Sequence, residues 1–225
     1  MIEFSADEKE YLVPGAAGII QCKARVGATE KYAEDAPIAV ICHPHPLYSG
    51  TMDNKVVTTL ARVFRSRGLN HLRFNFRGVG KSEGKHDDMR GESDDLDLLL
   101  NLIAQDRPGQ KFILAGFSFG SGVSSTVAAR RQDVVHLVLV APPVGKYESA
   151  YHSQYSCPLS VYQGGADDVV DPKLVIGWSD RIESASKLYW FEDVGHFFHG
   201  KLPELSAQVN IALDSKIGTK KEINR

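Results

Sequence analysis

The feature that most constrains the fold of this chain is a short apolar run that ends in a Gly-x-Ser-x-Gly pentapeptide. Residues Phe112 to Ala115 are apolar and lead directly into Gly116-Phe117-Ser118-Phe119-Gly120, after which small residues follow. An apolar run of this length predicts a buried strand. Between a strand and a helix, this pentapeptide forms a nucleophile elbow, because its glycines permit a turn tight enough to hold the serine hydroxyl clear of the sheet. Ser118 is therefore a candidate nucleophile, and the N–H of Phe119, at the expected helix start, is a candidate oxyanion donor.

Apolar runs alternate with amphipathic segments along the rest of the chain. The runs predict strands at residues 38–42, 69–76, 134–140, 159–163 and 187–191. Periodic segments predict helices at 51–67, from near 93, from the elbow to about 131, at 173–182 and at 203–216. This alternation predicts an α/β fold with a mostly parallel central sheet and helices on both faces. We expect one domain over residues 1–225, with a hairpin within about 1–28 and a loose polar tail at about 218–225.

Composition excludes several classes of function. The net charge of -2 and the pI near 6.4 argue against nucleic acid or an anionic membrane as the main partner. The N-terminal stretch is acidic where a signal peptide needs a basic segment, and no stretch approaches the length of a membrane span. Three cysteines without a CxxC pair fit free thiols in a reducing compartment. We therefore expect a cytoplasmic protein; the sequence leaves the oligomeric state open.

A serine nucleophile needs a base and a carboxylate that orients the base. His196 follows the last predicted strand and Asp167 follows the preceding one. The order Ser, Asp, His along the chain is the order of the α/β-hydrolase fold. Asp168 and Asp171 are rivals for the acid, and Asp167-Asp168 has the alternative role of a helix cap. The histidines that compete with His196 for the role of base are His71, His86, His136, His152 and His199.

The turn His43-Pro44-His45-Pro46 follows another buried strand. Its H-x-H pattern is a weak metal signal, because no further ligands follow at metal-hydrolase spacing. A backbone N–H here would complete an oxyanion hole, and since proline has none, His45 or Leu47 must supply it.

The glycine-rich loop 77–84 does not complete a nucleotide-binding motif. Gly80-Lys81-Ser82 resembles the end of a P-loop, but its first glycine is replaced by Asn75, and Glu83 occupies the third glycine position of a dinucleotide fingerprint. We therefore expect no metal and no cofactor.

Five segments together resemble the small, cap-free α/β-hydrolases, a largely bacterial group of predicted serine hydrolases. They are HPHPLYSGTMDNKVV (43–57), RFNFRGVGKSEG (73–84), GFSFGSGV (116–123), QGGADDVV (163–170) and VGHFFHGKL (194–202). The resemblance implies a catalytic triad of Ser118, Asp167 and His196, with an oxyanion hole formed by Phe119 and the HPHPL turn.

Lids of this fold commonly enter between the sixth and seventh strands, where this chain has only a short connector at about 145–157. We therefore expect an open site that takes a small ester with a short acyl group. The side chains expected to wall it are Leu47, Tyr48, Phe117, Tyr147, Tyr151 and Phe197. A peptidase or a thioesterase would use the same triad, and a non-catalytic binding protein of this fold is the third alternative.

Overall fold

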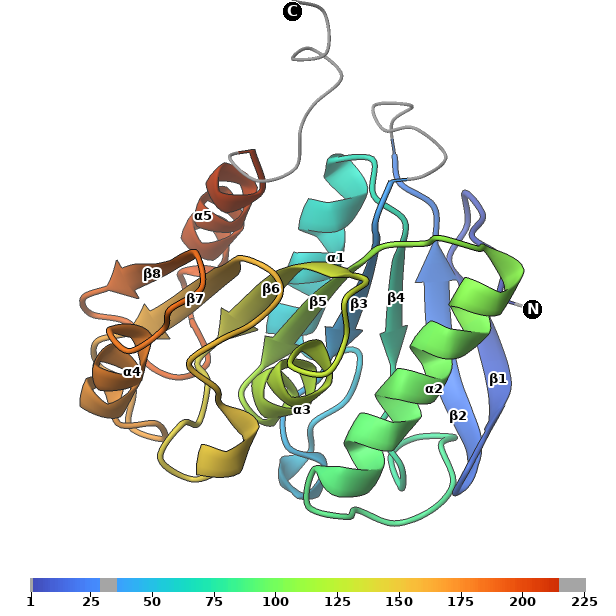
Figure 1. The fold of residues 1–225 in the computed structure, drawn as a ribbon, viewed down its shortest axis with the longest axis horizontal. Coiled ribbons are helices and arrows are strands. Elements are labelled where there is room, and N and C mark those ends of the chain that lie inside the picture. The colour runs from blue at the N-terminus through green and yellow to red at the C-terminus, as the bar shows by residue number, and fades with distance from the viewer. Residues whose placement is uncertain (1, 29–35, 215–225) are drawn as a thin grey trace, which may run out of the picture.

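A central eight-stranded sheet carries helices on both faces in the computed structural model, which describes residues 2–28 and 36–214 (Figure 1). The strands are β1 (Lys9–Gly15), β2 (Gly18–Arg25), β3 (Ile38–Cys42), β4 (His71–Phe74), β5 (Phe112–Phe117), β6 (Val134–Val140), β7 (Leu159–Gly164) and β8 (Ser186–Phe191). Their order in the sheet is β1-β2-β4-β3-β5-β6-β7-β8. β2 runs antiparallel to β1 and β4, and all other neighbours are parallel. The predicted fold class is confirmed.

The helices divide between the two faces of the sheet. They are α1 (Lys55–Ser66), α2 (Arg90–Asp106), α3 (Phe119–Ala128), α4 (Pro172–Ser179) and α5 (Leu202–Asp214), with short 3-10 turns η1 (Pro46–Tyr48) and η2 (Glu148–Ala150). α1 and α5 pack against each other on one face, while α2, α3 and α4 lie on the other (Figure 1). Because both faces are covered, every residue of β3, β5 and β7 is buried, as expected for central parallel strands.

The starts of two helices differ from the prediction. α1 begins at Lys55 instead of Thr51, because the Asn54 side chain accepts a hydrogen bond from the Val56 N–H and caps the helix there. α2 begins at Arg90, before Ser93, so Ser93 is a buried residue within the helix and not its cap. Met89 precedes α2 with a positive φ of 75° and makes no side-chain capping bond.

Two other boundaries also differ. β4 covers only His71–Phe74 of the predicted 69–76, and all of its residues are buried, because β2 and β3 flank it and helices cover both faces. α3 ends at Ala128, three residues before the predicted end. The predicted polar tail and the end of the last predicted helix lie outside the described residues.

The parallel strands place the candidate residues at one edge of the sheet. β3 ends just before His43, β5 ends just before Ser118, and β8 ends a few residues before His196. Asp167 follows β7 by three residues. Chemistry in open α/β sheets lies at the carboxyl ends of the strands, and Ser118, Asp167 and His196 meet there.

Candidate active site

Ser118 sits in a strained turn between β5 and α3. Its backbone has φ 53° and ψ -120°, a conformation that side-chain-bearing residues seldom adopt, and its N–H donates to the carbonyl of Val140 at 2.9 Å. The flanking glycines leave room for the turn. A Cβ on Gly116 would lie 2.2 Å from the carbonyl oxygen of Gly120, and one on Gly120 would lie 2.4 Å from that of Cys42. Because these neighbours are backbone atoms, only glycine fits at positions 116 and 120 with the chain in this tight turn.

A continuous hydrogen-bonded chain joins Ser118, His196 and Asp167. His196 Nε2 lies 2.9 Å from Ser118 Oγ, and His196 Nδ1 lies 2.9 Å from Asp167 Oδ2. Because a carboxylate only accepts, the ring proton lies on Nδ1, and Nε2 is left to accept from the serine hydroxyl. His196 is only 3% exposed, so this arrangement is shielded from water. The geometry is that of a nucleophile, a base and an orienting acid.

Asp167 is held as an anion by the groups around it. Burial by itself raises the pKa of a carboxyl group, but hydrogen bonds from His196 and from the N–H groups of Val170 and Val169 outweigh that effect. The pKa of Asp167 therefore lies below its ordinary value. Asp167 Oδ2 also accepts from the side-chain amide of Gln163 at 3.1 Å. A charged Asp167 is the state that can stabilise a protonated His196.

The rival acids lie in different surroundings. Asp168 is exposed, and no hydrogen bond to its side chain occurs within the described residues. Asp171 precedes α4, and its side chain caps that helix by accepting from the Lys173 N–H at 2.9 Å. Neither rival contacts His196, so the structure brings only Asp167 to the imidazole.

The other histidines make contacts elsewhere. His43 is fully buried, where its Nε2 accepts from the Phe76 N–H and its Nδ1 lies 2.6 Å from the Pro44 carbonyl. His136 Nε2 lies 2.8 Å from Ser160 Oγ in the core. Within the described residues, the contacts of His71, His86, His152 and His199 likewise involve neither Ser118 nor Asp167.

The turn after β3 offers His45, rather than Leu47, as the second oxyanion donor. The Leu47 N–H already donates to His45 Nδ1 at 3.2 Å, whereas no bond from the His45 N–H occurs within the described residues. His45 lines the same cavity as Ser118 and Phe119, and its ring packs on that of Phe119 at 4.8 Å. Burial, together with the nearby His86 and Lys146, lowers the pKa of the His45 imidazole to about 4, so the ring is neutral at pH 7.

A cavity of about 420 Å³ opens beside Ser118. Of the side chains predicted to wall the site, Tyr48 and Tyr147 line it. Phe117 is fully buried and packs behind His196 at 5.2 Å. Tyr151 is buried against Trp178, while Phe197 stands edge-on to His196 at 5.1 Å, outside the cavity lining. Leu47, also expected at the wall, is exposed and does not line the cavity.

Sequence reasoning missed the apolar wall opposite Tyr48 and Tyr147. Its side chains are Pro143, Val169, Val170 and Leu174. Val169 is 62% exposed and Leu174 is 49% exposed, so both offer apolar surface to a ligand. The signal in the sequence was the Val169-Val170 pair directly after the candidate acids, where a surface loop of ordinary composition is polar.

Residues 2–28 and 36–214 lack two features that would suggest another kind of site. Within these ranges, no group of three or more His, Cys, Asp or Glu side chains is arranged to hold a metal ion. Within the same ranges, no helix is both long and apolar enough to cross a membrane.

The fold and the Ser118 elbow define the class: the protein is a serine hydrolase with the α/β-hydrolase fold. Residues 38–152 match the model of the family described as serine aminopeptidase, S33. The chain belongs to this family.

Similar proteins support the assignment over most of the chain. An α/β serine hydrolase homologue from Coxiella burnetii is 39% identical with a TM-score of 0.83, and the match covers 91% of this chain and 97% of that one. A serine hydrolase without a lid from Xanthomonas campestris is 35% identical with a TM-score of 0.84, and the coverage is 93% and 95%. An uncharacterized protein of Rickettsia prowazekii is 35% identical over 185 residues, which is 78% of each chain.

Proposed function

We propose that this protein hydrolyses small carboxylic esters with short acyl groups, using Ser118, His196 and Asp167 as its catalytic triad. The observation that carries the proposal is the unbroken chain of hydrogen bonds from the Ser118 hydroxyl through His196 to the Asp167 carboxylate. Family membership gives the reaction class, hydrolysis by a serine hydrolase. The ester preference and the residue roles are our proposal.

In the first half of the reaction, Ser118 Oγ forms a bond to the ester carbonyl carbon as His196 Nε2 takes the hydroxyl proton. The carbonyl oxygen becomes an oxyanion, which the N–H groups of Phe119 and His45 stabilise. Asp167 stabilises the protonated imidazole. The bond from carbon to the alcohol oxygen then breaks, and His196 returns its proton to that oxygen, leaving an acyl-enzyme.

In the second half, water takes the place of the alcohol. His196 removes a proton from water, the hydroxide attacks the acyl carbon, and a second oxyanion forms at the same two N–H groups. The bond to Ser118 Oγ breaks, and the serine recovers its proton from His196. The two halves of the reaction together consume one ester and one water and need no oxidant, metal or further co-reactant.

The apolar wall and the absence of a cap support a short acyl group. The segment between β6 and β7 holds only the short turn η2, so this segment forms no cap over the cavity that could shield a long chain. Pro143, Val170 and Leu174 offer apolar contact over a few carbon atoms beside Ser118.

The family description favours a second candidate, an aminopeptidase, which must recognise a substrate ammonium group. The cavity lining includes one carboxylate, Asp171, and that side chain already caps α4. Because the Asp171 carboxylate already accepts a hydrogen bond from the Lys173 N–H, it is less available to a substrate ammonium group. An ester therefore fits the cavity better than a peptide with a free N-terminus. A thioesterase uses the same steps, and thioesters belong in the substrate screen.

Covalent labelling tests the nucleophile. A fluorophosphonate should label the wild-type protein, and Ser118→Ala should abolish the label, because the probe reacts only with an activated serine. Ser206→Ala removes a hydroxyl from α5, on the other face of the sheet, and should leave labelling intact. Intact-protein mass spectrometry measures the label. If Ser118→Ala is still labelled, Ser118 is not the nucleophile.

Acyl length tests the ester preference. For a series of 4-nitrophenyl esters, we expect kcat/KM to be highest for acetate or butyrate and to fall for decanoate and longer acyl groups. The reason is that the open cavity contacts only the first few carbons of the chain. Initial rates below the solubility limit of each ester give the comparison. A higher kcat/KM for the long-chain esters would contradict the short-acyl proposal.

A further inference from the structure

A second, larger hollow lies directly behind the cavity that holds Ser118. Its volume is about 770 Å³, and the two cavities share the wall segment Gly145-Lys146-Tyr147. Tyr147 packs edge-on against Phe119, the residue next to the nucleophile, with ring centroids 5.7 Å apart. A group attached to an ester at Ser118 therefore reaches the hollow by passing the Tyr147 ring.

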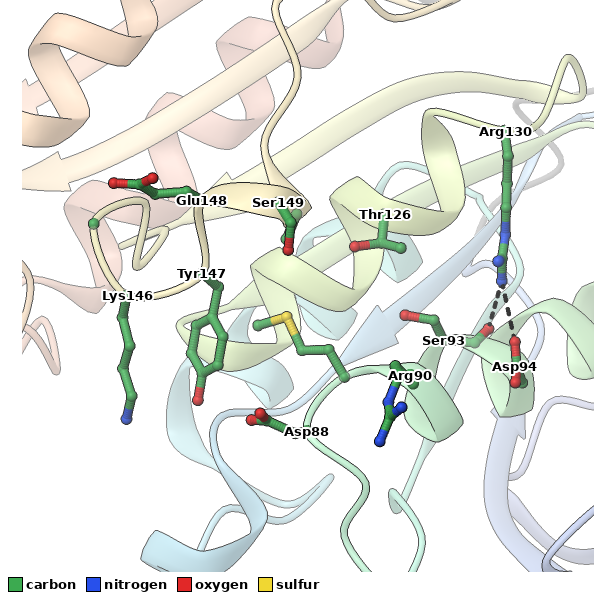
Figure 2. Close-up of a pocket in the computed structure, with 13 residues that line it drawn as sticks. Asp88, Arg90, Ser93, Asp94, Thr126, Arg130, Lys146, Tyr147, Glu148 and Ser149 are labelled. Atoms are coloured by element: carbon green, nitrogen blue, oxygen red, sulfur yellow. Dashed lines mark hydrogen bonds and ion pairs between the residues drawn. The ribbon is translucent and has the colours of Figure 1, made fainter.

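The lining of the hollow is polar and carries no net formal charge. Figure 2 shows its side chains, which come from the start of α2 and the residues before it, from α3 and the turn after it, and from η2 and the segment that precedes it. The cations are Arg90, Arg130 and Lys146, and the anions are Asp88, Asp94 and Glu148. Three charges of each sign give no preference for a polyanion, a polycation or an apolar chain.

Hydroxyl groups surround the middle of the hollow. Ser93, Thr126 and Ser149 all line it (Figure 2). Ser93 is only 2% exposed, and its buried Oγ has no hydrogen-bond partner within residues 2–28 and 36–214. Leaving a buried hydroxyl unpaired is unfavourable, so this atom requires a partner that the described residues do not supply. Figure 2 shows the Ser93 hydroxyl directed toward the middle of the hollow.

Several charged side chains that line the hollow also lack an ion-pair partner among the described residues. No hydrogen bond or ion pair to the side chains of Asp88 and Glu148 occurs within residues 2–28 and 36–214. The Lys146 ammonium lies over the rings of Tyr48 at 5.7 Å and Tyr147 at 5.3 Å, without a carboxylate partner in those ranges. The hollow thus offers acceptors, donors and groups that can do both, next to an aromatic wall.

We propose that this hollow binds a neutral, polyhydroxylated alcohol, such as a sugar, as the leaving group of the ester that Ser118 attacks. Each sugar hydroxyl both donates and accepts, which matches the mixed lining, and the C–H face of a sugar ring suits the Tyr147 wall. The inference rests on the proposed function: with a short acyl group beside Ser118, only the alcohol part extends past Tyr147.

The test compares two acetate esters whose alcohol part is built on a six-membered ring. One is a monoacetylated methyl glucoside, and the other is cyclohexyl acetate, which lacks the hydroxyl groups. For the wild-type protein, we expect kcat/KM for the sugar ester to exceed that for cyclohexyl acetate by at least about tenfold, through a lower KM. Acetate esters of choline and of glycerol 3-phosphate serve as the cationic and anionic comparisons, and both should fall below the sugar ester.

Ser93→Ala separates recognition from folding. We expect it to reduce the preference for the sugar ester over cyclohexyl acetate by roughly threefold to tenfold, with the change in the KM of the sugar ester, as for one lost hydrogen bond. Because Ser93 Oγ has no hydrogen-bond partner among the described residues, the variant should not lower the melting temperature. Thr126→Val, a change of similar shape, should reduce the same preference, and the remote Ser206→Ala should leave it unchanged.

The possible failures are distinguishable. If the wild-type protein hydrolyses neither ester, the proposed esterase function fails, and the alcohol subsite fails with it. If cyclohexyl acetate is hydrolysed at least as well as the sugar ester, the esterase function stands and the subsite is overturned. A charged ester that outperforms the sugar ester, or a preference unaffected by Ser93→Ala and Thr126→Val, also overturns it; in the latter case Ser93 meets only water.

Discussion

Asp167 and Asp168 are neighbours with the same side chain, yet the fold gives them opposite surroundings. The Asp167 side chain is buried and hydrogen-bonded to His196, Gln163 and two backbone N–H groups, whereas Asp168 is exposed. The sequence limited the candidates for the acid to the short segment that contains Asp167, Asp168 and Asp171. The choice between the two residues depends on which carboxylate the turn after β7 directs toward His196.

We therefore expect Asp167→Asn to lower kcat for a short-chain ester by about 10³- to 10⁴-fold, because an amide can hold His196 in the wrong tautomer. Asp168→Asn is the matched control, and it should change kcat by less than about threefold. Steady-state rates at pH 7 to 8 measure both variants. A larger loss of kcat in Asp168→Asn than in Asp167→Asn would instead assign the role of the acid to Asp168.

Residue type and position predicted the candidate nucleophile and the candidate base, but not the cavity lining. Ser118 and His196 follow from motif and position, since each lies just after a predicted strand. Phe117 and Tyr151 are aromatic residues close to the site in sequence, but they point into the core. Which side of a turn or connector faces the ligand depends on packing with distant elements, and local sequence does not carry that information.

At the scale of elements, the junction β5–Ser118–α3 depends on how closely it approaches the end of β3. Gly120 lies where the chain after β3 crosses the start of α3, and a Cβ there would be 2.4 Å from the Cys42 carbonyl oxygen and 2.5 Å from that of His43. Both neighbours are backbone atoms, so neither can move without shifting the turn that carries His45. The glycine links the elbow to the candidate oxyanion hole.

Gly120→Ala should destabilise the protein by at least about 2 kcal/mol, because the added methyl overlaps backbone that cannot rotate away. Gly177→Ala in α4 is the control, since the nearest atom to its Cβ would be the Arg181 guanidinium at 3.8 Å. The control should stabilise the protein by up to about 1 kcal/mol through helix propensity. Urea denaturation gives both values, and equal effects of the two substitutions would refute the steric account.

Element boundaries were harder to predict than the elements themselves. The sequence correctly located the strand before the elbow and the helix after it. It placed the start of α1 four residues early, because Asp53 fits a helix pattern but makes tertiary contacts instead. Asp53 pairs with Lys23 and Arg73, from β2 and β4, which holds this segment outside the helix.

At the scale of the whole molecule, burial of two histidines couples folding to pH. His43 and His71 are 0% and 2% exposed, and burial is the main cause that lowers the pKa of each from 6.5 to about 4. Between these values, the unfolded chain binds protons that the folded protein does not. Stability from each neutral histidine is therefore complete above about pH 6.5 and is lost as the pH falls toward 4.

We expect the free energy of unfolding to fall steeply between pH 7 and pH 4.5, by on the order of 2 kcal/mol for each of the two histidines. His43→Gln should flatten this dependence by about that amount, because glutamine does not titrate. His199→Gln, at an exposed position, is the control and should keep the wild-type slope. Urea denaturation at intervals across this pH range measures the slopes; a wild-type slope in His43→Gln would contradict the account.

The sequence was enough to predict the class of fold, the candidate nucleophile and the candidates for base and acid, because buried strands, amphipathic helices and tight glycine turns each leave a local pattern. The tertiary structure shows that Asp167, not Asp168 or Asp171, contacts His196, and that Pro143, Val170 and Leu174 form the cavity wall. It also revealed the polar hollow behind Tyr147. These features arise where α2, α3, α4 and η2, distant in the chain, pack at one edge of the sheet, and such contacts leave no periodic trace in sequence.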